Sequence, residues 1–453
     1  MPERLSAREV LALVADADSF RELPAAPGDP RPDGPLAWRG YDASRARAAE
    51  RTGEQESVVC GTASVDGTRA VLIAFEFGFL GGSLGERTGD RLVAAYVHAR
   101  EHRLPVVPLI ATGGSRMQEG ILALTQLQRV ARQSVLTRQA GLPQVAVVRD
   151  PTTGGGWATL GAGADVVLAL PGAQVGFAGS RVRPPDADPC AYTAEAQTAV
   201  GSADAVVPVR DLRSTLATWL TLLAARRAPA APAPVPFALG TAELPDSGWD
   251  AVGRARAAGR PRARAYLDAY FAYRVQISGD RCGGTDPDGM LCGFGEHDGR
   301  TVAYAAQTGT ATRPAGYRTA ARLVRLADRL GIPVLTLVDT PGAANDAEAE
   351  RQGAGAAIAE VFAAVAGARV PITTLVIGEG GSGGALALAA PGNTWATPDS
   401  YFSVIAPELA AAILKRPPEE AEATAGQLRV RPQDLVELGM VRGVVTPADH
   451  PRP

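Results

Sequence analysis

The chain has 453 residues, of which 46% are hydrophobic and 21% are charged, and its formal net charge is −3. This length and apolar content suffice for two domain cores, while the charge gives no basic field for nucleic acid. No apolar run reaches the roughly 20 residues of a membrane span, and the four cysteines form no CxxC pair. We therefore expect a cytoplasmic protein with no metal site and no nucleic-acid or membrane partner.

The N-terminal half is predicted to alternate short apolar strands with helices. After a charged, amphipathic N-terminal segment come "RLPVVPLIATGG" near Leu104 and "GLPQVAVVRDPTTGGG" near Leu142, with the helical pattern "ILALTQLQRVARQSVLTRQAG" between them. The strands are almost continuously apolar, which is typical of a sheet covered on both faces. This alternation predicts the α/β class.

A segment rich in proline and alanine, "RRAPAAPAPVPFALG", separates this half from the next. It has no periodicity and is typical of an interdomain linker. We therefore expect an N-terminal domain at residues 1–228, a linker at 229–240 and a C-terminal domain at 241–453.

The C-terminal half repeats the plan of the first. A helical pattern, "AGYRTAARLVRLADRLG", precedes the strands of "GIPVLTLVDTPG" and "RVPITTLVIGEGGSGG". Pro105 and Pro143 are 38 residues apart, and so are Pro333 and Pro371. Equal spacing in the two halves predicts a duplicated domain.

The glycine-rich turn "GEGGSGG" fits several known motifs. It contains GxGxxG starting at Gly378, with Asp399 downstream as in a dinucleotide site, but the motif comes late in its domain. It also contains GxSxG around Ser382, the pattern of a serine nucleophile elbow, but the only downstream histidine is His450, close to the end of the sequence. A third alternative is that the glycines only permit close packing of strand on helix.

A further string, "DTPG", is similar to a GTPase switch motif. That function requires a phosphate loop ending in GK[ST]. The only lysine is Lys415, and it is followed by Arg416 and Pro417. The sequence therefore excludes a GTPase.

Both halves carry a glycine cluster at the same place. "DPTTGGG" ends at Gly156 and "GEGGSGG" ends at Gly384, each 13 residues beyond its proline. Both clusters lead into small-residue helix starts, where backbone N–H groups are unpaired and attract negative charge. Two such turns predict two oxyanion holes, and a side chain at Gly155 or Gly383 is expected to abolish turnover in a folded protein.

Several longer stretches resemble a known family. "GGSLGERTGDRLVAA", "ATGGSRMQEG", "GLPQVAVVRDPTTGGG" and "ADVVLALPGAQVGFAGSRV" resemble the β subunit of bacterial acetyl-CoA carboxylase carboxyltransferase. "PAGYRTAARLVRLADRLGIPVLTLVDTPGA", "VIGEGGSGGALALAA", "SYFSVIAPELAAAILK" and "LVELGMVRGVV" resemble its α subunit. The resemblance implies two tandem crotonase-like domains, each a ββα superhelix of the α/β class.

The resemblance also implies roles for individual residues, because the family's N-terminal domain holds the CoA thioester and its C-terminal domain holds biotin. The implied catalytic oxyanion pairs are Gly154 with Gly155 and Gly383 with Gly384, although the repeat register of the first half would select Gly155 with Gly156. The expected substrate-binding residues are Gly113, Gly114, Arg116, Gly156, Gly381 and Ser382, and the expected biotin-side residues are Gly342, Ala343 and Tyr317.

Two of these side chains have a structural alternative. Arg116 and Glu119 lie one helical turn apart, which fits an ion pair as well as contact with the phosphates of CoA. Tyr317 and its neighbour Arg318 fit helix packing and a solvated face as well as a binding site.

The implied reaction is carboxyl transfer between carboxybiotin and the α-carbon of an acyl-CoA. It places negative charge on the thioester oxygen and on the ureido oxygen of biotin, one for each hole. Because the biotin enolate can itself remove the α-proton, no side-chain base is then required. Because Lys415 lies in "LKRPP" and not between methionines, biotin is expected on a separate carrier protein, with a separate biotin carboxylase. The family's site lies between the N domain of one protomer and the C domain of another, which implies a homodimer or a larger homo-oligomer.

Two other functions stay open from the sequence. The same two holes suit a biotin-independent decarboxylase that acts on a malonyl-type thioester of CoA or of an acyl carrier protein. The four-cysteine zinc ribbon of bacterial β subunits is missing, and "RPPDADPCAYTAEAQTAVG" replaces a helix of the family, so the acyl group is unassigned. The third function is a non-catalytic scaffold subunit, against which the intact glycines of both turns argue.

Overall fold

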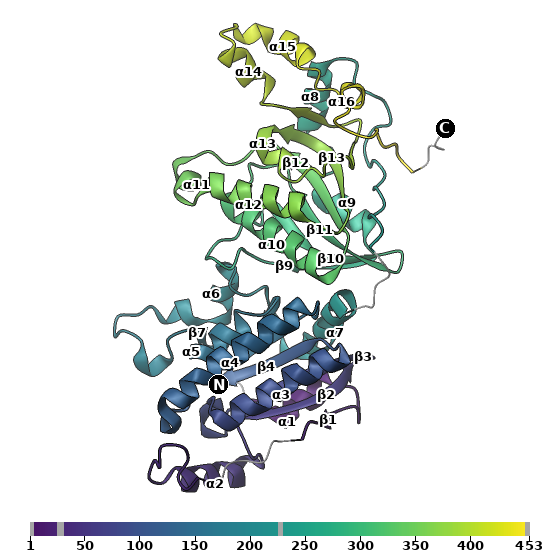
Figure 1. The fold of residues 1–453 in the computed structure, drawn as a ribbon. Coiled ribbons are helices and arrows are strands. Elements are labelled where there is room, and N and C mark those ends of the chain that lie inside the picture. The colour runs from purple at the N-terminus through teal and green to yellow at the C-terminus, as the bar shows by residue number, and fades with distance from the viewer. Residues whose placement is uncertain (1–3, 25–30, 225–229, 449–453) are drawn as a thin grey trace. The chain divides into compact units, whose positions relative to one another are not determined.

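The computed structural model describes residues 4–24, 31–224 and 230–448. Of these, residues up to 224 together with 281–283 form one compact unit, called unit 1, and residues 230–280 together with 284–448 form unit 2. Each unit is a mixed α/β body with its own sheet, which confirms the predicted fold class (Figure 1). None of the helices in the described ranges has an apolar stretch that could cross a lipid bilayer.

Unit 1 is built on an eight-stranded sheet in the order β1-β2-β3-β4-β5-β6-β8, with β7 paired to β5. Strands β2 and β3 form an antiparallel hairpin, while β3, β4, β5 and β6 are parallel neighbours. The strands are β1 (Arg21–Glu22), β2 (Val58–Val65), β3 (Thr68–Phe75), β4 (Val106–Thr112), β5 (Val145–Thr153), β6 (Val166–Ala169), β7 (Val175–Gly176) and β8 (Ala205–Val206).

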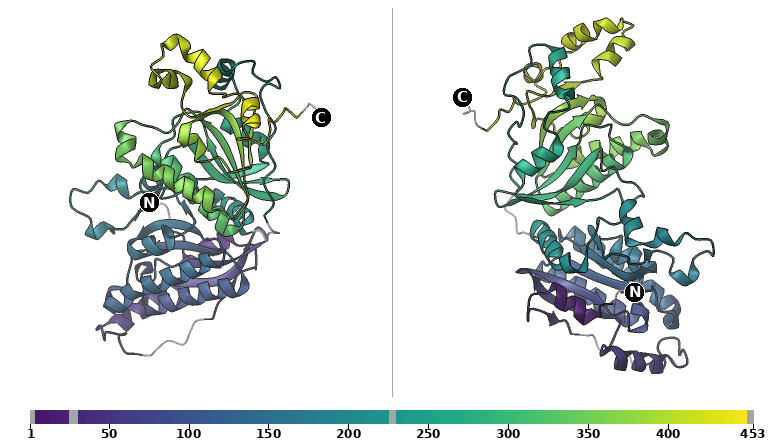
Figure 2. Two further views of the ribbon diagram at one scale, coloured as in Figure 1. Left: turned by 45° about the horizontal axis from the view of Figure 1, so that its top comes forward. Right: turned by 180° about the vertical axis from the view of Figure 1, so that it is seen from behind.

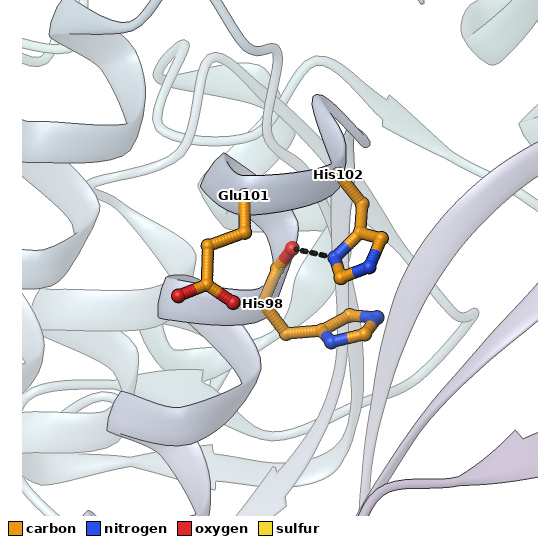
Figure 3. Close-up of side chains that lie close together, drawn as sticks. All are labelled: His98, Glu101 and His102. Atoms are coloured by element: carbon orange, nitrogen blue, oxygen red, sulfur yellow. Dashed lines mark hydrogen bonds between the residues drawn. The ribbon is translucent and has the colours of Figure 1, made fainter.

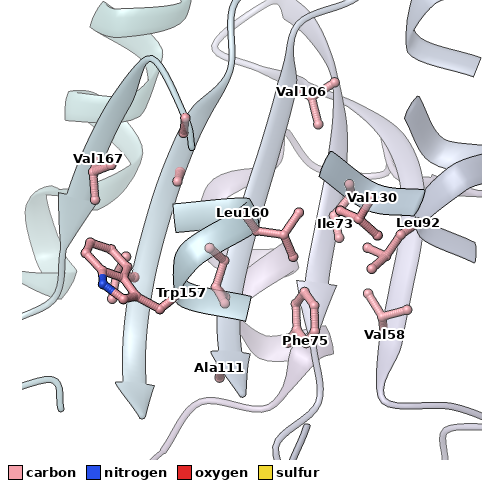
Figure 4. Packing of buried hydrophobic residues seen from close by; sticks show 14 of the residues in the cluster. Val58, Ile73, Phe75, Leu92, Val106, Ala111, Val130, Trp157, Leu160 and Val167 are labelled. Carbon is pink, nitrogen blue, oxygen red and sulfur yellow. The ribbon is translucent and has the colours of Figure 1, made fainter. Parts of the chain in front are cut away.

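Helices cover the sheet of unit 1, as its apolar strands require. Side chains of α3 and α4, among them Leu92 and Val130, pack with Val58, Ile73 and Phe75 in one buried cluster (Figure 4). Helices α1 and α7 contact each other and strands β2 and β3. The helices are α1 (Ala7–Val14), α2 (Tyr41–Thr52), α3 (Glu86–His102), α4 (Gly120–Gln139), α5 (Gly154–Gly156), α6 (Ala194–Ala199) and α7 (Leu212–Ala224).

Unit 2 has a seven-stranded sheet in the order β14-β13-β12-β11-β10-β9, with β15 paired to β13. Figure 2 shows the green ribbon of this unit from two further sides. Strands β9, β10 and β11 are antiparallel, and β11, β12, β13 and β14 are parallel. The strands are β9 (Tyr273–Ile277), β10 (Met290–His297), β11 (Arg300–Gln307), β12 (Val334–Thr340), β13 (Ile372–Gly381), β14 (Thr394–Ala396) and β15 (Tyr401–Ser403).

The helices of unit 2 also follow the sequence pattern. The stripe Ala320, Leu323, Val324 and Ala327 of α10 is fully buried, and α10 ends at Gly331 in the left-handed conformation that favours glycine. The helices are α8 (Gly248–Arg256), α9 (Ala263–Tyr270), α10 (Pro314–Leu330), α11 (Ala347–Arg351), α12 (Ala354–Gly367), α13 (Ser382–Leu386), α14 (Pro407–Ile413), α15 (Ala421–Gln427) and α16 (Pro432–Glu437).

The two units repeat one plan in register. Helices α3 and α10 both have 17 residues, strands β4 and β12 both have seven, and each pair begins 228 positions apart. Isolated bridges also recur at this offset, Leu84 with Ser115 and Thr312 with Ala343. This register makes the end of each strand in unit 1 directly comparable with its counterpart in unit 2.

The segment expected to be a linker differs from that expectation where the structure describes it. Residues 230–240 have extended backbone, but Ala233 and Ala238 are buried in the core of unit 2. Thr373 donates a hydrogen bond to the carbonyl of Ala233 at 2.9 Å. The small alanine side chains between prolines let this segment lie flat against the sheet. Residue 229 of the expected linker lies outside the described residues.

Candidate active site

In each unit, two strands that are neighbours in the sheet each end in a turn. The first of these turns follows a buried threonine, Thr112 in unit 1 and Thr340 in unit 2. In unit 1 the N–H of Gly114 donates to Thr112 Oγ1 at 3.1 Å. In unit 2 the N–H of Gly342 donates to Thr340 Oγ1 at the same 3.1 Å. Gly114 has φ +111° and Gly342 has φ +143°, a region that side chains rarely adopt, so glycine is required at both places.

The second turn of each unit begins a helix with a left-handed residue. Gly154 opens α5 with φ +64°, and Ser382 opens α13 with φ +60°. A serine in this conformation stores on the order of 1–2 kcal/mol of backbone strain. Such strain persists where the surrounding structure enforces it, and it is concentrated at functional sites.

The two turns of a unit lie against each other. A Cβ built on Gly154 would lie 3.3 Å from the Cα of Gly114. In unit 2 a Cβ on Gly381 would lie 2.1 Å from the carbonyl oxygen of Pro341, and one on Gly384 would lie 2.6 Å from the nitrogen of Ala343. Bare backbone therefore packs on bare backbone at both sites.

The hydrogen bonds of unit 1 correct part of the predicted oxyanion pair. The N–H of Gly154 donates to the carbonyl of Phe177 at 3.0 Å, and that of Gly113 donates to the carbonyl of Gly81 at 2.9 Å. These N–H groups, like that of Gly114, are engaged and cannot also serve a substrate oxygen. Gly155 and Gly156 follow at the second and third positions of α5, where a helix leaves its N–H groups unpaired.

In unit 2 the same two positions of α13 are Gly383 and Gly384. The repeat register therefore pairs Gly155 with Gly383 and Gly156 with Gly384, 228 positions apart. This matches the alternative register of the sequence analysis and not the pair Gly154 with Gly155, because the left-handed residue that opens each helix, Gly154 or Ser382, precedes the pair.

At three of these four positions a side chain would clash with neighbouring atoms of the protein. A Cβ on Gly155 would lie 2.2 Å from Leu127 Cδ1, one on Gly156 would lie 2.4 Å from Thr112 Cγ2, and one on Gly384 would lie 2.5 Å from Tyr317 Oη. A Cβ on Gly383 would meet nothing within 4 Å, and Gly383 has no left-handed φ. Packing explains the first three glycines and leaves Gly383 facing open space.

Tyr317 lies beneath the turn of unit 2 and not on its open side. Its side chain is 1% exposed, and its Oη donates to the carbonyl of Gly384 at 3.1 Å. Gln307 Nε2 donates to the same carbonyl at 3.1 Å. Burial raises the pKa of Tyr317, which keeps the phenol a neutral donor. Tyr317 is therefore buried against the turn, which differs from the direct contact with biotin that the sequence analysis expected.

The side chain of Arg116 is only 1% exposed, so it is too deeply buried for the expected contact with substrate. Its guanidinium binds both carboxylate oxygens of Glu56, at 2.5 and 3.1 Å, and donates to Tyr41 Oη at 3.2 Å. Burial opposes ionisation of Glu56, but the charge and hydrogen bonds of Arg116 lower the pKa of that carboxyl overall. The structure corrects the predicted contact of Arg116 with CoA phosphates and bears out a structural ion pair, with Glu56 as the main partner and Glu119 at 3.6 Å.

A buried acid, which the sequence analysis did not single out, supports the turn of unit 2. Asp339 precedes Thr340 and is fully buried. It accepts from Arg260 Nη2 at 2.5 Å and from the N–H of Glu379 at 3.2 Å, so it joins the ends of β12 and β13. The sequence did carry a signal for the two turns themselves. A threonine at the end of a strand is followed two residues later by a glycine, in both "ATGG" and "DTPG".

Beside α13 an apolar pocket of about 360 Å³ opens in unit 2. Its walls include Phe362 of α12, Leu386 of α13, Phe402 of β15 and Met440. On α13 its lining begins at Leu386 and does not include Gly383 or Gly384, so the glycine turn is not part of this pocket.

The two halves match different protein families. Residues 35–201 match the carboxyl transferase domain, and residues 245–449 match the acetyl co-enzyme A carboxylase carboxyltransferase-like family. Relatives named acetyl-coenzyme A carboxylase carboxyl transferase subunits beta/alpha include one from Salinispora arenicola, 39% identical over 99% of this chain and 84% of the relative. Another, from Saccharopolyspora erythraea, is 38% identical over 98% of this chain and 80% of the relative.

Solved structures are similar at the level of the fold. A transcarboxylase 12S structure, described as a hexamer with methylmalonyl-coenzyme A bound, has a TM-score of 0.81 at 23% identity and covers 98% of this chain and 88% of that one. A single-chain, multi-domain long-chain acyl-CoA carboxylase has a TM-score of 0.74 at 22% identity, over 98% of this chain and 46% of that one. These neighbours confirm the expected fold of two tandem crotonase-like domains.

Proposed function

The chain belongs to the acetyl-CoA carboxylase carboxyltransferase family and is a carboxyl transferase, and from this premise we propose how its two glycine turns perform the transfer. Gly155 and Gly156 of unit 1 hold the oxygen of an acyl-CoA thioester. Gly383 and Gly384 of unit 2 hold the ureido oxygen of biotin. The observation that carries the proposal is Gly383, a glycine that the fold does not require and that faces open space.

Each turn acts by presenting backbone donors to a charge that develops during the reaction. When the α-carbon of the thioester gives its proton to the ureido group of the biotin that has lost its carboxyl group, negative charge moves to the thioester oxygen. The N–H groups of the unit 1 turn stabilise that charge. Donors fixed by the fold need no reorganisation, and one such donor is worth on the order of 3 kcal/mol. The buried threonines and Asp339 keep these donors in place.

The turn of unit 2 fits biotin in its chemistry. Carboxybiotin supplies the carboxyl group that is transferred. The bicyclic ring of biotin is apolar apart from its ureido group, whose oxygen suits a pair of fixed backbone donors. Gly342 and Ala343 lie against Gly384 and shape this side of the turn, while Tyr317 holds the carbonyl of Gly384 from beneath.

We propose that biotin arrives on a separate carrier protein after loading by a separate biotin carboxylase. The only lysine of this sequence is Lys415, at the end of α14 and outside any biotinylation pattern. The proposal includes assembly of at least two copies, which is supported by exposed apolar side chains on α14, Leu409 and Ile413, and on α4, Ile121 and Leu124. The four cysteines form no CxxC pair in the sequence, from which we infer a reducing, cytoplasmic location.

One assay tests the function. The purified chain is incubated with malonyl-CoA or methylmalonyl-CoA, with and without a biotinylated carrier protein. Decarboxylated acyl-CoA that forms only when the carrier is present, together with carboxylated carrier, is the expected result. Release of CO2 at the same rate without the carrier would instead establish a biotin-independent decarboxylase, and no reaction in either case would favour a scaffold subunit.

A further inference from the structure

The last two turns of α3 bring two imidazoles and a carboxylate together on the surface of unit 1. His98, Glu101 and His102 occupy positions i, i+3 and i+4, which are neighbours on a helix. One nitrogen or oxygen atom from each lies within 4.8 Å of the others, and Figure 3 shows the three side chains on the same stretch of helix. Glu101 and His102 are exposed and His98 is half-buried.

The hydrogen bond between the two histidines sets the tautomer of His102. Its Nδ1 lies 3.0 Å from the carbonyl oxygen of His98 (Figure 3). A carbonyl can only accept, so Nδ1 carries the proton and Nε2 keeps a free lone pair. Histidines that bind metals are commonly oriented in this way by a backbone carbonyl on their other nitrogen.

The imidazole of His98, the second proposed ligand, lies beside that of His102. The rings of His98 and His102 are stacked, with centroids 4.0 Å apart and planes inclined by 25°. Glu101 supplies a negative charge, and the unpaired carbonyls at the helix C-terminus add negative potential. Arg69 is the nearby cation that opposes these terms.

We propose that His98, Glu101 and His102 form a binding site for a divalent first-row transition ion of the Zn²⁺ class. Two imidazoles and one carboxylate are a ligand set that suits zinc, and the exposure of the site leaves a fourth position for water. Metal–ligand distances of about 2.0–2.2 Å place ligand atoms at most about 4.4 Å apart. Binding of the ion therefore requires the exposed side chains of Glu101 and His102 to rotate toward it.

The role assigned to this ion is structural. Glu86 and His102 are the two ends of α3, so at 1.5 Å per residue the site lies roughly 24 Å along the helix from its first turn. That first turn follows the loop at Gly81 whose carbonyl binds Gly113. An ion at the far end ties together the last turns of α3 and touches none of the residues proposed to hold substrate. The inference therefore stands or falls independently of the proposed carboxyl transfer.

The test is direct titration of the full-length, metal-stripped protein with ZnCl2 in a non-chelating buffer, followed by calorimetry and by competition with a chromophoric chelator. One equivalent is expected to bind. Because each ligand contributes to the site, His102→Ala is expected to weaken binding by about tenfold or more, and the double variant His98→Ala/His102→Ala to abolish this equivalent.

Two controls separate this site from other zinc ligands. His297→Ala removes a histidine of unit 2 and should leave the affinity unchanged, while Arg69→Gln keeps all three ligands and should leave it equal or tighter. Circular dichroism establishes that each variant is folded. Absence of zinc binding to the folded wild type, or equal binding by the double variant, overturns the proposal; in the second case the exposed thiols of Cys190 and Cys282 would be the source.

Discussion

Replacing Gly383 by alanine tests whether this glycine is required for stability or for catalysis. Gly383 is the second residue of α13, and an added methyl group would meet no protein atom within 4 Å. Cα–Cβ bonds of a helix tilt toward its N-terminus, which is also the end at which the unpaired N–H groups point. The methyl group of Gly383→Ala therefore enters the space that we assign to the ureido oxygen of biotin.

The expected effects on stability and on activity have opposite signs. Alanine replaces glycine at a helical position without a clash, so the free energy of unfolding should stay equal or rise by about 0.5–1 kcal/mol. Displacing the bound oxygen from its donor costs about 2.7–4 kcal/mol, which corresponds to a loss of about 10² to 10³ in rate. A folded and equally stable protein with at least about a hundredfold lower turnover is the prediction.

The measurement pairs thermal unfolding with the steady-state rate of carboxyl transfer from malonyl-CoA to a biotinylated carrier. The matched control is Gly355→Ala, on the exposed face of α12, where an added Cβ also meets nothing within 4 Å. This control should gain stability to a similar extent and keep its activity. Wild-type turnover in folded Gly383→Ala would refute the assignment of the hole. Gly155→Val, which the sequence suggested as a similar test, is unsuitable because Leu127 fills that space.

Three further predictions concern side chains around the site. Thr340→Val removes the acceptor for the Gly342 N–H, so we expect a loss of about 1–3 kcal/mol in the free energy of unfolding, measured by urea denaturation, and a lower kcat. Arg116→Met leaves Glu56 buried without its partner and should cost about 3–5 kcal/mol in the same measurement, whereas a surface ion pair would cost less than about 1 kcal/mol. Burial raises the pKa of Asp286 from 3.8 to about 6, so the folded state binds more protons and stability should fall as the pH rises through this interval. Asp286→Asn should abolish that decrease and be more stable than wild type by about 1–3 kcal/mol at pH 8. An unchanged slope in the variant would show that another group is responsible.

The proposed zinc site illustrates a signal that was present in the sequence and not used. The sequence analysis expected no metal site. The spacing of His98, Glu101 and His102 is that of one helix face, and the surrounding segment does form a helix. What the spacing alone could not supply is the hydrogen bond from His102 to the His98 carbonyl, which leaves Nε2 free.

Local sequence patterns determined the fold class, the main strands and helices, and the duplication. Apolar runs bounded by proline and glycine became β4, β5, β12 and β13, and the buried stripe of α10 lies where its helical period places it. These features depend on residues close together in the chain, so periodicity and turn chemistry suffice to predict them. The motifs around both glycine turns likewise identified the family, because they are continuous in sequence.

Only the tertiary structure shows which groups around each turn are already engaged by other parts of the protein. The N–H of Gly154 donates to the carbonyl of Phe177, and Arg116 donates to Glu56, some 60 positions away. The hydroxyl of Tyr317 donates to the carbonyl of Gly384. Each of these partners is distant in sequence, and whether a donor is free depends on where every nearby acceptor lies after folding. The sequence indicates that glycine backbone without side chains is needed at two turns. The packing of the folded chain determines which N–H groups of those turns are already bound to acceptors within the protein.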